Sequence, residues 1–357
     1  MDGTSAKKST SFETLVIQSI TNVNDLKAKL NHIIATGKDY EYNVSSCLKT
    51  LLLSSDQEIV LLSVQAVSEL AKCEDKREVY AQKEVIEPII DILKKEINSD
   101  KTELLKQCCR ALGNLCCNCD TSRKIILDYN GVSIIMKSLK QAIEKGGEFE
   151  DVKVYGTKMF QNFAIGGAQF SESIVQEGLI ELLHKILVLE LEKDDMNDDM
   201  VLTALFVLSI INDNNPEYLF EEYVNKAVLD VLRETTNVEI SELCLEHLHV
   251  QAEHDSVKTL LAKESGLQLV CTRLEQLVQK HDAGDLNADD YEIVAILKQA
   301  CDLIIIVLTG GKKISIENYL TKYVVSTDRS GDIHVHVQTW VLLLTDELFQ
   351  AEKPVTL

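Results

Sequence analysis

One amphipathic pattern returns along this chain at a nearly constant spacing. It occurs in five segments: 83–97, 130–143, 177–187, 225–235 and 265–278. Within each segment apolar residues recur at i, i+3, i+4 and i+7, the period of a helix with one buried face. The spacing is 47 residues three times and then 41, measured at Glu84, Gly131, Gly178, Asn225 and Gly266. Such a period predicts an array in which each unit buries its apolar face on its neighbours.

A second, more apolar helix is predicted in each unit. These helices lie at 58–73, 103–119, 152–166, 200–213, 240–254 and 291–308. After each we expect a short third helix, as at 121–131 and 170–178. Three helices in 41–47 residues is the armadillo or HEAT pattern. The predicted fold is therefore all-α, an armadillo-repeat solenoid of roughly six to seven three-helix units.

Polar insertions and irregular ends set the expected boundaries. The segments 143–151, 190–199 and 279–290 are acidic and separate the first helix of a unit from the second, as loops do. We expect the array to span 13–322, after a disordered leader at 1–12. Residues 323–357 form the expected incomplete terminal repeat and tail, with one apolar helix at 334–350.

Charge and hydropathy limit the classes of function. The chain has 57 Asp and Glu against 36 Lys and Arg, a net charge of −21. It is therefore predicted not to bind nucleic acid and to attract basic partners instead. A secretory signal and an apolar run long enough for a bilayer are both missing from the sequence, so no direct membrane insertion is expected. We expect a cytoplasmic monomer with its ten cysteines reduced.

Five cysteines crowd into "QCCRALGNLCCNCD" (107–120). On a single helix over 103–119, Cys108 and Cys119 share a stripe with leucines, and Cys109 and Cys116 share a neighbouring stripe. Buried cysteine behaves as a small hydrophobe, so helix packing accounts for most of them. Cys116 and Cys119 form a lone C-x-x-C, which supplies only two zinc ligands. Zinc binding or redox chemistry remains the alternative.

Other polar motifs do not match a catalytic pattern. "EHLHVQAEH" (246–254) lacks H-E-x-x-H, and His247 and His254 stand too far apart to chelate one ion, so we interpret it as a solvated helix face. "TGGKKIS" (309–315) has Ile306 where a phosphate loop needs glycine. We expect no catalytic residue, no metal and no cofactor.

An acidic stripe is the better candidate for binding. Glu239, Glu242 and Glu246 recur at i, i+3 and i+7 on the helix 240–254. Like charges at this spacing repel by a few tenths of a kcal/mol per pair, which a basic partner would relieve. The alternative is a merely solvated face.

Polar residues also interrupt the apolar helices. Arg110 and Asn114 lie four apart in "RALGNL", and Asn162 holds the same place in "MFQNFA". In an armadillo array this helix lines the concave groove, where Asn amides could bind an extended backbone. The alternative is hydrogen bonding between neighbouring repeats.

The chain resembles the armadillo-repeat GDP-dissociation stimulators of small GTPases (smgGDS type). The resemblance is carried by "LLKQCCRALGNLCCNCDTSRKIILDYNGVSIIMKSL" (104–139), "SIVQEGLIELLHKIL" (173–187), "CLEHLHVQAEHDSVKTLLAKESGLQLV" (244–270) and "KQACDLIIIVLTGG" (298–311). It covers roughly residues 40–320. Aligned by "AEHDSVK", Glu239 and Glu246 fall where this family carries its acidic patch.

This resemblance implies a function in GTPase regulation. It implies binding of Rho- and Rap-type GTPases through a basic, prenylatable C-terminal tail, promoting GDP dissociation without covalent chemistry. Family members continue well past this length, so exchange could be weak or lost, leaving a carrier or chaperone. The alternative is a general armadillo adaptor for extended peptides. Trp340, the only tryptophan, lies outside the series of second helices, unlike the Trp–Asn ladder of importins.

Overall fold

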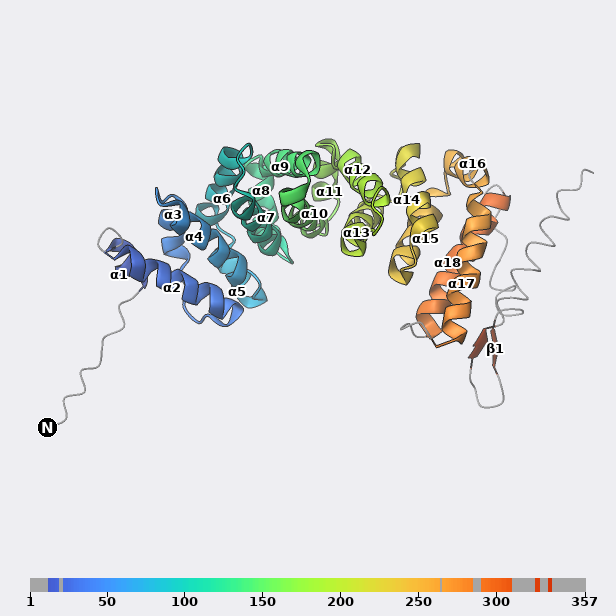
Figure 1. Cartoon of the computed structure of the whole chain (residues 1–357), viewed down its shortest axis with the longest axis horizontal. Coiled ribbons are helices and arrows are strands. Elements are labelled where there is room, and N and C mark those ends of the chain that lie inside the picture. The colour runs from blue at the N-terminus through green and yellow to red at the C-terminus, as the bar shows by residue number, and fades with distance from the viewer. Residues whose placement is uncertain are drawn as a thin grey trace, which may run out of the picture. The chain divides into compact units, whose positions relative to one another are not determined.

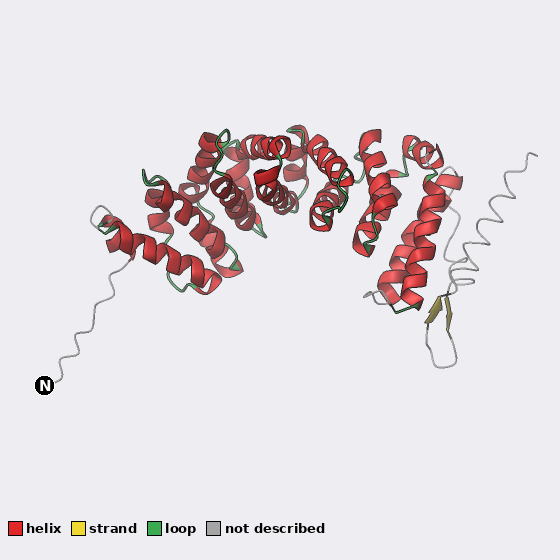
Figure 2. Cartoon of the chain, in the orientation of Figure 1, coloured by secondary structure: helices red, strands yellow, loops and turns green. Residues whose placement is uncertain are grey.

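The computed structural model describes residues 12–18, 22–263, 265–284, 290–309, 325–327 and 333–335. The chain forms two compact units, 1–185 and 186–357. Most of the described residues are helical, as Figure 2 shows in red, and the helices are labelled in Figure 1. No helix in the described ranges is both long and apolar enough to cross a bilayer.

The first unit is built from eleven complete helices and the start of a twelfth, with two short 3-10 turns. These are α1 (Phe12–Ile17), α2 (Val23–Thr36), η1 (Gly37–Asp39), α3 (Ser45–Leu52), α4 (Gln57–Leu70), α5 (Glu74–Tyr80), α6 (Lys83–Glu96), α7 (Thr102–Cys116), α8 (Asp120–Asp128), α9 (Gly131–Lys145), η2 (Gly147–Phe149), α10 (Glu150–Ala164), α11 (Ala168–Gln176) and α12 (Leu179–Leu191). The unit boundary falls within α12.

The apolar helices α4, α7 and α10 pack against one another in succession, with α7 in the middle. Gly113 lets α7 and α10 approach closely, because a Cβ there would lie 3.2 Å from the Met159 Cα. The first helices of the units, α6 and α9, contact α7 and α10 respectively. This is the predicted arrangement of three-helix units.

The second unit continues the pattern. It contains α13 (Asp198–Asn214), α14 (Glu222–Glu234), α15 (Val238–Gln251), α16 (Asp255–Lys263), α17 (Gly266–Asp282) and α18 (Asp290–Thr309). Here α15 packs between α13 and α18. The insertions 143–151 and 190–199 overlap the connections between a first and a second helix, as predicted, and 279–290 lies partly outside the described residues.

The predicted short third helix is wrong at one place. Helices α5, α8, α11 and α16 occupy this position elsewhere, but Asn215–Glu221 joins α13 to α14 without a helix. The connection is shorter than α8 or α11 itself, so a helix of that length does not fit. The equal spacing of 47 residues also does not mark the same position of the first helix in every repeat. Gly131 and Gly178 lie at helix starts, whereas Asn225 lies inside α14, which begins at Glu222.

A second correction concerns the cysteine-rich helix. It ends at Cys116 and not at Cys119, because Asn118 takes a left-handed conformation with φ of 49°. Asn tolerates this conformation better than most residues. Cys119 then becomes the residue before α8.

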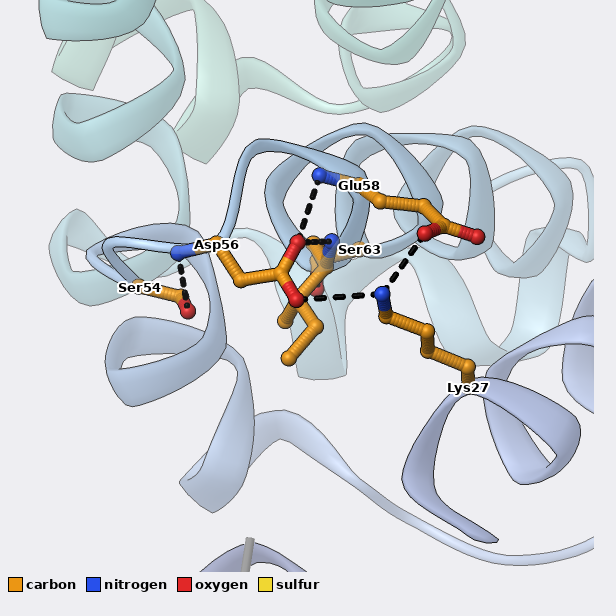
Figure 3. Close-up of polar contacts among 6 residues, drawn as sticks. Lys27, Ser54, Asp56, Glu58 and Ser63 are labelled. Atoms are coloured by element: carbon orange, nitrogen blue, oxygen red, sulfur yellow. Dashed lines mark hydrogen bonds and ion pairs between the residues drawn. The ribbon is translucent and has the colours of Figure 1, made fainter. Parts of the chain in front are cut away.

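Side-chain caps begin several of the apolar helices. Asp56 accepts hydrogen bonds from the backbone N–H of Glu58 (2.9 Å) and of Ile59 (3.3 Å) at the start of α4. Figure 3 shows Lys27 of α2 bridging the two carboxylates, 3.0 Å from Asp56 and 2.6 Å from Glu58. The hydrogen bond with Lys27 lowers the pKa of Asp56. Asn197 caps α13 and Asn237 caps α15 in the same way. Such caps satisfy backbone donors that the helix leaves unpaired.

Buried arginines form hydrogen bonds between successive three-helix repeats of the first unit. Arg77 of α5 donates to the carbonyl of Ala71 (3.0 Å), just past α4, and to that of Cys117 (2.6 Å), just past α7. Arg123 of α8 likewise donates to the carbonyl of Asn162 in the last turn of α10 (3.0 Å). Both side chains therefore donate hydrogen bonds to backbone carbonyls at helix ends. These carbonyls have no donor within their own helix.

The region after α18 contains two short strands. β1 (Val325–Thr327) pairs antiparallel with β2 (Ile333–Val335). The helix predicted over 334–350 is wrong at its first two residues, which belong to β2. Its remaining residues, Trp340 included, lie outside the described part of the chain, as do residues 310–315 of the loop-like motif and the expected leader before Phe12.

Candidate functional site

The acidic stripe lies on the side of α15 that is not packed. Asn237 fixes the start of this helix by accepting from the backbone N–H of Glu239 at 2.9 Å. Glu239 is exposed, and Glu242 and Glu246 are half-buried, whereas the residues between them are mostly buried. The structure therefore presents all three carboxylates on one face of α15.

Acidic residues on neighbouring helices extend this face. Burial raises the pKa of Glu246, and the charge of Asp213 on α13 raises it further. Burial also raises the pKa of Asp302 on α18, although His249 and Lys298 nearby act in the opposite direction. Among the described residues, none forms an ion pair with Glu239, Glu246 or Asp213. We call Glu239, Glu242, Glu246 and Asp213 the acidic surface.

The corresponding helices of the first unit neutralise their own carboxylates. Arg110 of α7 lies 2.7 Å from Glu69 of α4. Lys106 of α7 bridges Glu103 of its own helix (2.6 Å) and Asp151 of α10 (3.2 Å). The negative charge of the first unit is thus partly satisfied internally, whereas Glu239, Glu246 and Asp213 of the second unit form no ion pair among the described residues.

The three groove candidates form contacts within the array. Besides its ion pair, Arg110 lies over the ring of Tyr155, 5.9 Å from the centroid. The Asn114 amide donates to the carbonyl of Ser68 on α4 (2.9 Å). The Asn162 amide donates to the carbonyl of Gly113 on α7 (3.0 Å). These contacts favour the interpretation in which both amides join neighbouring repeats. Arg110, Asn114 and Asn162 remain half-exposed, so a groove role stays a prediction.

Sequence reasoning missed a buried polar network between α13, α14 and α15. The prediction that 246–254 is a solvated face is wrong for His247, which is 2% exposed. Its Nδ1 lies 3.4 Å from the Asn212 amide nitrogen, and its Nε2 lies 2.9 Å from Asn225 Oδ1. Gln251 donates to Asn212 Oδ1 at 3.1 Å. Only a neutral ring with its proton on Nε2 satisfies these partners, since Asn212 donates to Nδ1.

This burial makes stability depend on pH. Desolvation lowers the pKa of His247 from 6.5 to about 4. As pH falls through 6.5, His247 becomes protonated in the unfolded chain, whereas in the folded chain it stays neutral until about pH 4. The free energy of unfolding therefore decreases as pH falls across that window. Urea unfolding should show that the free energy of unfolding falls between about pH 7.5 and about pH 5. We expect this fall to be roughly 2 kcal/mol larger for wild type than for His247→Gln. Equal losses in the two proteins would contradict the buried neutral imidazole.

Three cysteines of the cluster are packing residues. Cys108, Cys109 and Cys116 are at most 1% exposed. Burial raises the pKa of Cys109 to about 12 and that of Cys116 further, so both remain thiols at neutral pH. Thiols in this state are poor nucleophiles and poor ligands. Within the described ranges, no three His, Cys, Asp or Glu side chains come together as a metal site would require.

The chain is similar in sequence to proteins described as GTPase-GDP dissociation stimulators. The Drosophila melanogaster GTPase-GDP dissociation stimulator vimar is 28% identical over 275 residues, which is 76% of this chain and 42% of vimar. The Xenopus laevis Rap1 GTPase-GDP dissociation stimulator 1-B is 23% identical over 260 residues, 72% of this chain and 40% of that protein. The chain thus spans about two fifths of the length of these relatives. The family of the V-ATPase H subunit matches residues 6–150.

Solved structures agree on the fold. The designed armadillo repeat protein YIII(Dq)4CqI superposes with a TM-score of 0.53 at 18% identity, covering 68% of this chain and 100% of that one. A computationally designed armadillo repeat protein for modular peptide recognition gives 0.54 at 18% identity, covering 67% and 99%. The predicted fold class and the predicted family resemblance are therefore confirmed: this chain is an all-α armadillo-repeat protein and a homologue of the GTPase-GDP dissociation stimulators.

Proposed function

We propose that this protein regulates small GTPases of the Rho or Rap type by binding, and that the acidic surface receives their basic C-terminal tail. The observation that carries the proposal is that Glu246 lies beside Asp213 and shares one face of α15 with Glu239, and that none of the three forms an ion pair among the described residues. The relationship to proteins that stimulate GDP dissociation supports the same function.

The proposed action has two parts. The acidic surface captures a lysine- and arginine-rich tail, which speeds encounter and selects the partner by charge. Contacts between the array and the GTPase body then promote GDP dissociation, or the complex chaperones the GTPase with its tail prenylated. Both actions proceed by binding, without a catalytic side chain, metal or cofactor, and we place them in the cytoplasm with the protein as a monomer.

GDP release tests this function directly. We expect the full chain to accelerate release of fluorescent GDP from a Rho-type GTPase that has its basic tail, and to have little effect once the tail is removed. The tail should matter because most of the attraction is electrostatic, and it should matter less at high salt. A parallel binding measurement separates carrier from exchange factor: binding without acceleration indicates a carrier. Failure to bind the GTPase with its tail would rule out the proposal.

A general adaptor for extended peptides is the second candidate. The half-exposed Asn114 and Asn162 on successive apolar helices favour it. Their bonds to neighbouring repeats count against it, because each has already committed an amide N–H. Binding of basic peptides with equal affinity whether or not they belong to a GTPase would favour the adaptor.

A further inference from the structure

No third helix lies in the described connection between α13 and α14. The contacts between these two repeats, which we call the α13–α15 joint, therefore differ from those between the repeats before them. In the first unit, Arg77 and Arg123 reach from the short helices to carbonyls near the ends of α7 and α10. No such helix precedes α14, where Asn215–Glu221 runs as a connection. At this joint the direction of contact is reversed, because a side chain from the last turn of α15 reaches back to the connection.

That side chain is Gln251, which is fully buried. Its amide nitrogen donates to the carbonyl of Tyr218 at 2.8 Å, and its oxygen accepts from the backbone N–H of Phe220 at 3.0 Å. Asn225 of α14 holds the same connection by donating to the carbonyl of Phe220 at 3.3 Å. A single amide thus supplies two of the hydrogen bonds that the absent helix would have made internally.

The connection and the two flanking helices form one closed network. His247 and Gln251 lie four residues apart on α15 and both contact Asn212 of α13. His247 also contacts Asn225 of α14. Because α15 is held at two positions one turn apart, it cannot rotate about its axis without breaking several buried hydrogen bonds. Each broken bond would leave a buried polar group unpaired, which is costly.

We infer that this network of Asn212, Asn225, His247 and Gln251 positions the acidic surface. It sets the rotation of α15 so that Glu246 faces Asp213, the residue directly after Asn212. The expected effect on binding of a basic tail rests on the proposed function. Its structural part, the placing of Glu246 beside Asp213, stands separately and has its own measurement.

The test compares Gln251→Met, which keeps the volume but removes both polar atoms, with Val231→Ala, which weakens the buried face of α14 without touching the network. The probe is a fluorescent octapeptide of alternating lysine and arginine, titrated with the full chain at low salt. We expect Gln251→Met to bind about tenfold more weakly, with a shallower salt dependence, and Val231→Ala to bind as wild type does.

Titration of the Glu246 carboxyl by NMR separates positioning from general destabilisation. In Gln251→Met the raised pKa of Glu246 should move back towards its ordinary value, because rotation of α15 exposes this carboxyl and separates it from Asp213, and in Val231→Ala it should stay raised. Unchanged titration and unchanged binding in Gln251→Met would overturn the inference. If wild type fails to bind the peptide while the Glu246 titration responds as expected, the proposed function fails and the positioning role stands.

Discussion

Replacing Glu239, Glu242 and Glu246 together by lysine should weaken binding of a basic GTPase tail by roughly thirty- to a hundredfold at low salt, about 2 to 3 kcal/mol. Each reversal removes an attraction and adds a repulsion on the same face of α15. Asp213 cannot compensate, because it would then face the lysine at position 246. The effect should shrink as salt rises, since exposed charges are screened beyond about 10 Å at 0.1 M salt. Fluorescence anisotropy of a labelled tail peptide measures it.

A matched control separates local recognition from net charge. Glu144, Glu148 and Glu177 are exposed on the first unit and belong to other helices and connections than α15. Reversing these three changes the net charge by the same amount, so an equal loss of affinity would show that only the overall field matters. A loss confined to the α15 variant assigns the binding to the acidic surface.

Truncating Phe163 to alanine should destabilise the first unit by about 4 kcal/mol. Phe163 on α10 is fully buried and packs edge to face on Phe170 of α11, with ring centroids 5.2 Å apart and an interplanar angle of 74°. The variant loses this ring contact and leaves a cavity between α10 and α11. Urea unfolding followed by circular dichroism should show an earlier first transition.

The neighbouring Ile165 provides the control for this experiment. It follows α10 directly and is 51% exposed. Ile165→Ala should change the unfolding free energy by no more than about 0.5 kcal/mol, as expected for an exposed position. A similar shift in both variants would mean that the end of α10 is frayed and that Phe163 is not part of a fixed core.

The sequence was sufficient to predict the helices because each carries its own periodicity. Segments such as 83–97 alternate apolar and polar residues at 3.6-residue spacing, and this local pattern needs no knowledge of neighbours. The break at Asn118 was not predictable from that period, since apolar residues continue on both sides of it. The absent helix after α13 was missed because the repeat spacing was assumed to hold there.

For the same reason, local spacing in the sequence predicts the acidic stripe but not the buried network. Glu239, Glu242 and Glu246 lie on one helix, so their spacing alone places them on one face. Asp213 joins them only through the packing of α13 on α15, which the sequence does not reveal. His247 has a polar side chain in a polar stretch, and the partners that make its burial tolerable come from two other helices.

The arginine contacts and the α13–α15 joint have opposite consequences for how such an array can be rearranged. Arg77 and Arg123 bond backbone carbonyls, which every residue type provides. A neighbouring repeat could therefore be exchanged, duplicated or removed in register with little loss at those joints. At the α13–α15 joint the partners are particular side chains on both sides, each matched to the next. That pair of repeats must therefore be inherited or transplanted together, as a single module.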